Sequence, residues 1–180
     1  MKAIRLSIPL LLLPLINVAP APVVAADPPL RLALVIANST YQALPPLPQC
    51  SPAARNMAAA LKDAGFEVSE AYDVANAAMN AALASFVRKA SPQSVLMAYY
   101  CGYLAVFHDR PFLVPVSALV PVSAELTAPD RIMTEGVAAS ALINVMIRAD
   151  PHQGLAILDV APAPGKSDPV IETTFPAANP

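Results

Sequence analysis

Short apolar runs constrain the fold of this 180-residue chain most strongly. Three of them are apolar at almost every position, namely Leu32–Ala37 (LALVIA), Ser94–Cys101 (SVLMAYYC) and Gly154–Asp159 (GLAILD). Such runs are typical of parallel strands that helices cover on both faces. A fourth run, Phe66–Ala71, alternates apolar and polar residues and predicts a more exposed strand.

Helical patterns separate these runs. The first is Ala53–Ala64, which follows Pro52 and precedes Gly65. Its predicted inner face consists of Met57, Ala60, Leu61 and Ala64. Further helices are predicted at Asn76–Ala90 and Ser140–Arg148. Alternating strands and helices predict an α/β fold, with a mostly parallel sheet and helices on both faces.

The same pattern predicts where function is located. In sheets of this kind, sites lie just beyond the carboxyl ends of the strands. That rule selects Asn38–Tyr41, Gly102–Leu104 and Val160–Pro162. Gly102 is expected to end the third strand, and Phe107–Val116 is expected to form a hairpin with His108 near its tip.

The N-terminus predicts export. Lys2 and Arg5 precede the apolar stretch Leu6–Ile16, and small residues follow up to Ala26. This is the pattern of a secretory signal peptide, here residues 1–26, and it predicts a periplasmic or secreted protein without a membrane anchor after cleavage. The alternative is an uncleaved anchor, which the two prolines inside the stretch disfavour. The formal net charge of −2 offers no basic surface for nucleic acid.

The two cysteines, Cys50 and Cys101, are predicted to hold no metal. Neither has a second cysteine or histidine at the spacing of a metal site, and no other cofactor is indicated. In an oxidising compartment they can form a disulfide, whereas in the cytosol they would stay reduced. Both states remain open from the sequence.

Five segments in order resemble the bacterial caspase-like cysteine peptidases, the metacaspase relatives of peptidase C14 type. They are RLALVIANSTYQALPPLP from Arg31, AARNMAAALKDAGFEV from Ala53, LMAYYCGYL from Leu96, FLVPVSA from Phe112 and LAILDVAP from Leu155. The resemblance implies a caspase-like (p20-type) domain over residues 31–162, truncated at its C-terminal end. Residues 163–180 are then a proline-rich flexible tail. Cys50 lies in the loop after the first strand and Cys101 ends the third; the resemblance implies that these two strands are neighbours in the sheet, which favours the disulfide.

The resemblance also implies a site without its catalytic groups. Tyr103 stands at the position of the family's histidine, Ala161 at that of its cysteine, and Ala53 at that of an aspartate. A cysteine peptidase needs a thiolate and a nearby base. Alanine has no nucleophilic atom, and a tyrosine phenol normally titrates only near pH 10. Asp159 matches an aspartate that helps the family to recognise basic side chains; the alternative is an ordinary acid at a strand end.

Three functions follow from this comparison. The favoured one is an exported, catalytically inactive domain that binds or regulates a peptide or protein. The second is an active cysteine endopeptidase, for which the pair Cys101 and His108 is the only displaced dyad that the sequence suggests. The third is a truncated relic without function, which an adjacent reading frame encoding the missing portion would favour.

The predicted fourth strand, Gly154–Asp159, should form an edge of the sheet, because only Val170–Phe175 in the tail is long enough to pair with it. Unpaired backbone groups at such an edge invite another chain to add on. The tail strand, a second copy of the protein or a separate partner could cover it. We expect incomplete coverage and self-association.

Overall fold

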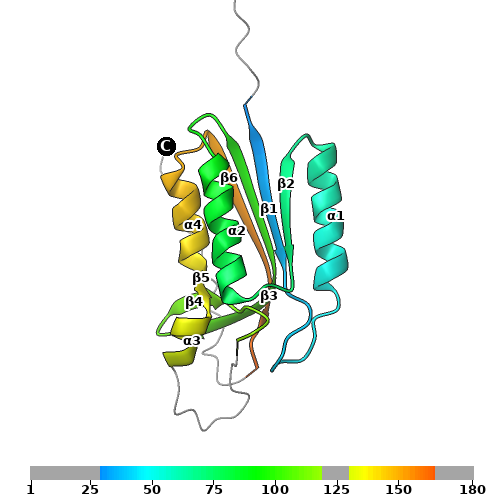
Figure 1. Ribbon diagram of the computed structural model, residues 1–180, viewed down its shortest axis with the longest axis vertical. Coiled ribbons are helices and arrows are strands. Elements are labelled where there is room, and N and C mark those ends of the chain that lie inside the picture. The colour runs from blue at the N-terminus through cyan, green and yellow to red at the C-terminus, as the bar shows by residue number, and fades with distance from the viewer. Residues whose placement is uncertain (1–28, 119–129, 165–180) are drawn as a thin grey trace, which may run out of the picture.

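The computed structural model describes residues 29–118 and 130–164. The predicted signal peptide (1–26) and all of the predicted tail beyond residue 164 lie outside this part of the chain. The described residues form a six-stranded sheet with helices on both of its faces (Figure 1). Within them, no helix is long and apolar enough to cross a membrane.

The sheet is mixed rather than mostly parallel. Its parallel strands are β1 (Arg31–Ala37), β2 (Glu67–Tyr72), β3 (Val95–Phe107) and β6 (Gln153–Pro162). Two short strands run antiparallel to their neighbours, β4 (Arg110–Leu113) to β3 and β5 (Val137–Ala138) to β4. β1 lies between β2 and β3, while β6 pairs with β3.

The antiparallel part arises because β3 does not end at Gly102. It continues to Phe107, and the chain then folds back through the two-residue turn His108–Asp109. Both turn residues have positive φ, 47° and 58°. A two-residue turn of this kind can join only antiparallel strands. The predicted hairpin is therefore confirmed, but its first strand is the end of the long central strand.

β4 lies on the same side of β3 as β1. The N–H groups of Asn38 and Val114 donate to the carbonyls of Cys101 and Tyr103 respectively. Alternate residues of a strand turn their carbonyls to opposite sides, so these two carbonyls point the same way. β4 thus occupies the space beside β3 that opens where β1 ends.

Helix α1 (Cys50–Asp63) covers one face of the sheet, whereas α2 (Asn76–Lys89) and α4 (Ala139–Arg148) lie side by side on the other (Figure 1). A short helix that the sequence did not indicate, α3 (Asp130–Glu135), precedes β5. The predicted helix at Asn76–Ala90 is confirmed as α2, which buries Met79, Leu83 and Phe86. Helices on both faces are confirmed as well.

The predicted inner face of α1 is largely wrong. The helix buries Cys50, Ala54, Ala58 and Leu61, of which only Leu61 was expected. The helix starts two residues before Pro52, and its first residue is fixed to β3 by a disulfide, which turns a row of small side chains towards the sheet. Its end is as predicted. Gly65 has a φ of 79°, and Phe66 N–H donates to the Leu61 carbonyl, as in a Schellman motif.

Candidate functional site

The three segments selected from the strand ends meet in the structure. Tyr103 on β3 and Ala161 on β6 are register partners in the parallel pairing of these strands. Tyr41, in the loop after β1, lies against Tyr103, with ring centroids 4.9 Å apart in an edge-to-face arrangement. The positions singled out by the resemblance are therefore neighbours at one end of the sheet.

Tyr41 closes this end of the sheet over β3. Its hydroxyl oxygen accepts a 2.8 Å hydrogen bond from the backbone N–H of Tyr103. Both side chains are buried, and burial raises the pKa of the Tyr41 phenol to about 12. The Tyr41 phenol therefore stays neutral near pH 7 and serves as a packing and hydrogen-bonding group.

Gly102 allows two tyrosines to reach this point. A Cβ at Gly102 would lie 2.5 Å from Tyr100 Oη and 2.7 Å from Tyr41 Oη, closer than such atoms can approach. The Tyr100 hydroxyl donates towards the carbonyls of Tyr103 and Val114, at 3.0 and 3.2 Å. Burial raises the pKa of Tyr100 well above its ordinary value. The hydroxyl groups thus fill the space that a side chain at position 102 would need.

A disulfide joins Cys50 at the start of α1 to Cys101 on β3, with the two Cα atoms 5.3 Å apart. Both cysteines are buried, and the described residues contain no free cysteine. His108, the other half of the imagined dyad, is exposed in the turn between β3 and β4, where its ring packs on Phe107. Because Cys101 is bonded to Cys50, this structure does not assemble a thiol–imidazole pair from Cys101 and His108.

Asp159 lies on β6 beside this site, as the register partner of Cys101. Its side chain is exposed, and its Oδ2 accepts a 3.0 Å hydrogen bond from the hydroxyl of Tyr99. Burial, and then this bond to the carboxylate, raise the pKa of Tyr99 to about 12. The Tyr99–Asp159 pair places one carboxylate at the surface next to Ala161.

Two residues that the sequence analysis did not connect position the loop that carries Tyr41. The fully buried Asn38 donates through Nδ2 to the Val114 carbonyl and accepts through Oδ1 from the Val74 N–H. Asp73 Oδ1 accepts from the N–H groups of the two residues after Asn38, Ser39 and Thr40. An aspartate directly after a strand is a recognisable turn signal, but nothing in the sequence says which loop it binds.

The functional groups that meet at this site are mainly phenols, one buried amide and the carboxylates of Asp73 and Asp159. Among the described residues, no group of three or more His, Cys, Asp and Glu side chains could hold a metal ion. Ala53 lies half-buried on α1 and adds no functional group. Asp73 is used to hold the loop that carries Tyr41, whereas Asp159 lies beside the Tyr103–Ala161 pair.

The fold and the position of the site define a class of protein. Its members have a mixed sheet with helices on both faces, and their site lies at the carboxyl ends of the central parallel strands. Residues 30–173 match the model of the caspase domain of peptidase C14. The chain belongs to the caspase-domain family.

One similar solved structure is protein GSU0716 from Geobacter sulfurreducens. It shares 12% sequence identity with this chain and superposes with a TM-score of 0.50 over 74% of it. The chain spans about half of that protein, since the match covers 50% of its length. At this identity the likeness concerns the fold alone. No curated protein matches the sequence.

Proposed function

We propose that this domain does not cleave peptides and acts instead as an exported module that binds or regulates a peptide or protein. The observation that carries the proposal is the pairing of Tyr103 with Ala161. By the resemblance, these positions correspond to the histidine and cysteine of caspase-like peptidases. A methyl group cannot attack a carbonyl, and the Tyr103 ring is used for packing against Tyr41.

The binding role rests on Asp159. It is an exposed carboxylate beside the pair, and by the resemblance it recognises basic side chains. An Arg or Lys side chain of a bound peptide would find a charged partner there, while the neighbouring residues supply no group that cleaves the peptide bond. We therefore propose retained recognition without turnover.

A peptide assay tests both halves of this proposal. Peptides ending in Arg, Lys or Asp should show no hydrolysis above a buffer blank, whereas Arg-ended peptides should bind, and Asp159→Asn should abolish that binding. The matched control is Asp63→Asn on α1, which should leave binding unchanged. Absence of binding by the wild-type protein would refute the recognition half. Turnover that disappears in Cys101→Ala would refute the proposal that the domain is inactive. It would support an active cysteine endopeptidase, the function that family membership alone favours.

The pairing of Tyr103 with Ala161 can be tested separately. In Ala161→Cys the new thiol has no base beside it, so its reaction with iodoacetamide at neutral pH should be slow. Adding Tyr103→His places an imidazole at the register partner and should accelerate the reaction by lowering the thiol pKa. Adding His108→Ala instead should change nothing. Equal rates in all three proteins would show that the two positions are not in contact.

A further inference from the structure

The segment that joins β1 to α1 is buried at every third residue. These buried side chains are at most 8% exposed, and they are Tyr41, Leu44, Leu47 and Cys50. Two residues separate each of these positions from the next, and three of the separating residues are exposed prolines, namely Pro45, Pro46 and Pro48. A period of three residues is found in 3₁₀-helices and in polyproline II helices. One edge of the segment thus packs on the fold while its prolines face outward.

The backbone decides between these two kinds of helix. Pro45 and Pro46 have no N–H to donate, and the Leu47 N–H donates out of the segment, to the Ser39 carbonyl at 2.8 Å. A 3₁₀-helix requires hydrogen bonds within the segment, whereas a polyproline II helix has none. Leu44, Pro45 and Leu47 also each precede a proline, which favours extended backbone over helical backbone. The segment is therefore of the polyproline II kind.

Both ends of this segment are fixed to the sheet. Before the prolines, the Gln42 N–H donates to the Val116 carbonyl at 3.0 Å. After them, Cys50 is joined to Cys101 of β3 by the disulfide. The connection between β1 and α1 extends beyond the carboxyl end of β1 (Figure 1). The prolines are thus held in one conformation on a part of the surface that projects from the sheet.

We propose that residues 45–49, the proline ridge, dock into the aromatic-lined groove of a partner protein domain that recognises polyproline II helices. Three residues per turn divide the side chains of such a helix among three edges. The edge of Leu44 and Leu47 packs on the fold. The two exposed edges are formed by Pro45 with Pro48 and by Pro46 with Gln49. A groove that approaches from outside can therefore contact proline rings without unpacking the inner edge.

The composition of the ridge favours this partner over a charged one. No residue between Arg31 and Arg55 is charged, so the ridge itself offers no ion pair to an acidic or basic ligand. Its proline rings present apolar carbon, which aromatic side chains can cover without desolvating a charge. Binding also orders little of the chain, because the fold already holds the prolines in place. Domains with aromatic grooves use this low entropic cost when they bind proline-rich segments.

The inference is independent of recognition by Asp159. Its test is calorimetric titration of the full chain, as processed by the expressing cell, with purified SH3 and WW domains, whose grooves are lined by aromatic residues. We expect saturable binding to at least one of them. Pro45→Ala with Pro48→Ala should weaken it by about tenfold or more, because one exposed edge then loses its rings. The matched control is Pro52→Ala, exposed in the first turn of α1, which should leave binding unchanged, as should Asp159→Asn.

Two further measurements guard against a folding defect in the double variant. The single variants Pro45→Ala and Pro46→Ala, one on each exposed edge, should each weaken binding by about threefold or more. A free peptide of residues 41–50 should bind about tenfold less tightly than the folded chain, because the peptide must be ordered on binding. A wild-type chain that binds neither kind of domain would overturn the inference. Binding that none of the ridge variants weakens, or a peptide that binds as tightly as the chain, would overturn it as well.

Discussion

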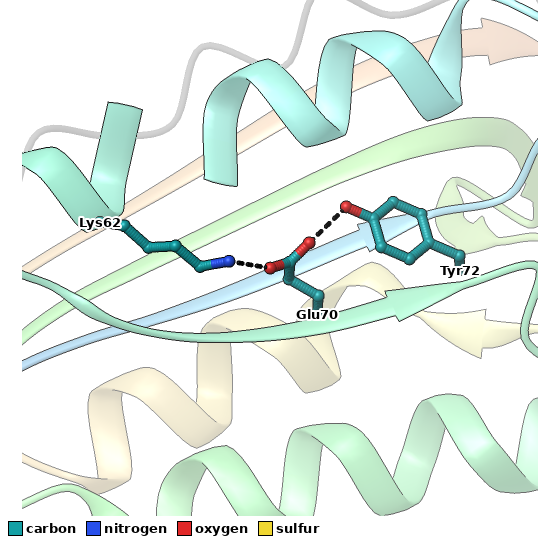
Figure 2. A network of polar contacts seen from close by, with 3 residues as sticks. All are labelled: Lys62, Glu70 and Tyr72. Atoms are coloured by element: carbon teal, nitrogen blue, oxygen red, sulfur yellow. Dashed lines mark hydrogen bonds and ion pairs between the residues drawn. The ribbon is translucent and has the colours of Figure 1, made fainter. Parts of the chain in front are cut away.

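The strands β2 and β6 are both paired on one side only within the described residues, yet their charges are arranged differently. On β2, Glu67 pairs with Lys89 of α2, and Glu70 pairs with Lys62 of α1. Figure 2 shows the Glu70 carboxylate between the Lys62 ammonium and the Tyr72 hydroxyl. On β6, the Asp159 carboxylate accepts from the Tyr99 hydroxyl and forms no ion pair with a described residue.

This difference shows how the helices on the two faces protect an edge. α1 and α2 each bring a lysine to β2, so a strand added there would have to approach a row of solvated charges. No ion pair is found on β6 in the described part of the chain. The β2 edge therefore disfavours the addition of a strand, whereas β6 carries no such ion pairs among the described residues.

The largest expected loss of stability comes from removing the disulfide that joins α1 to the central strand β3. Replacing both cysteines, Cys50→Ala with Cys101→Ala, opens a link between residues 51 positions apart. In the chain-entropy model such a loop stabilises the fold by about 4 kcal/mol, so urea unfolding of the double variant should show a loss approaching that value.

Reduction of the wild-type protein supplies the control for this prediction. Dithiothreitol should lower its stability to that of the double variant and should leave the double variant unchanged. Two thiols titrated in the non-reduced, denatured protein would contradict the disulfide. Equal stability of all forms would contradict its contribution to the fold.

A smaller effect is expected at the two tyrosine–carboxylate pairs. Burial first, and then donation to a carboxylate, raise the pKa of both Tyr72 and Tyr99 to about 12. The unfolded phenols ionise near pH 10, so this contribution to stability is complete below about pH 10 and is lost as pH rises towards 12. Tyr99→Phe and Tyr72→Phe should each lower stability at pH 7 by about 1 kcal/mol and flatten its alkaline decline.

Measuring urea unfolding of these variants between neutral and alkaline pH sharpens the comparison of the edges. Tyr99 is almost fully buried, whereas Tyr72 is half-buried at the β2 edge. Tyr99→Phe should therefore flatten the decline more than Tyr72→Phe. The reverse order would show that the neutral phenol of Tyr72, at the β2 edge, contributes more to stability than that of the more deeply buried Tyr99.

The smallest effect is expected from the ion pair on β2. The hydrogen bond from Lys62, followed by that from Tyr72, lowers the pKa of Glu70. A lowered pKa contributes stability above the unfolded value, near 4.3, and that contribution is lost as pH falls through the folded value. Lys62→Met should therefore destabilise the protein by about 1 kcal/mol or less at pH 7 and have no effect in acid.

Arg88→Met provides the matched control, because Arg88 is exposed on α2 without an ion pair among the described residues. It should leave the acid dependence unchanged. Charge at this edge can be tested as well: Glu67→Val with Glu70→Val should cause association through β2 that the wild-type chain does not show. A monomeric β2 variant would show that charge is not what keeps this edge unpaired.

The sequence alone was sufficient for the order of the main strands and helices. The run Leu32–Ala37 is apolar because helices cover both faces of its strand, and this requirement is local enough to be recognised. The same pattern identified Gly154–Asp159 as a strand, although Leu155 there is 55% exposed. The strand ends also identified the segments of Tyr41, Tyr103 and Ala161 as neighbours. That prediction succeeded because parallel strands bring their carboxyl ends to one side of the sheet.

Other features were decided only by the tertiary structure. The continuation of β3 through Gly102 depends on two tyrosine hydroxyls from different segments that fill the space above it. The buried face of α1 depends on the disulfide that fixes its first turn, since its many alanines define no single apolar stripe. The roles of Asn38 and Asp73 arise from hydrogen bonds to residues more than 30 positions away. Local patterns of apolar and polar residues determine which segments form strands and helices that contribute to the core. Contacts between distant segments determine where each strand ends and which face each helix buries.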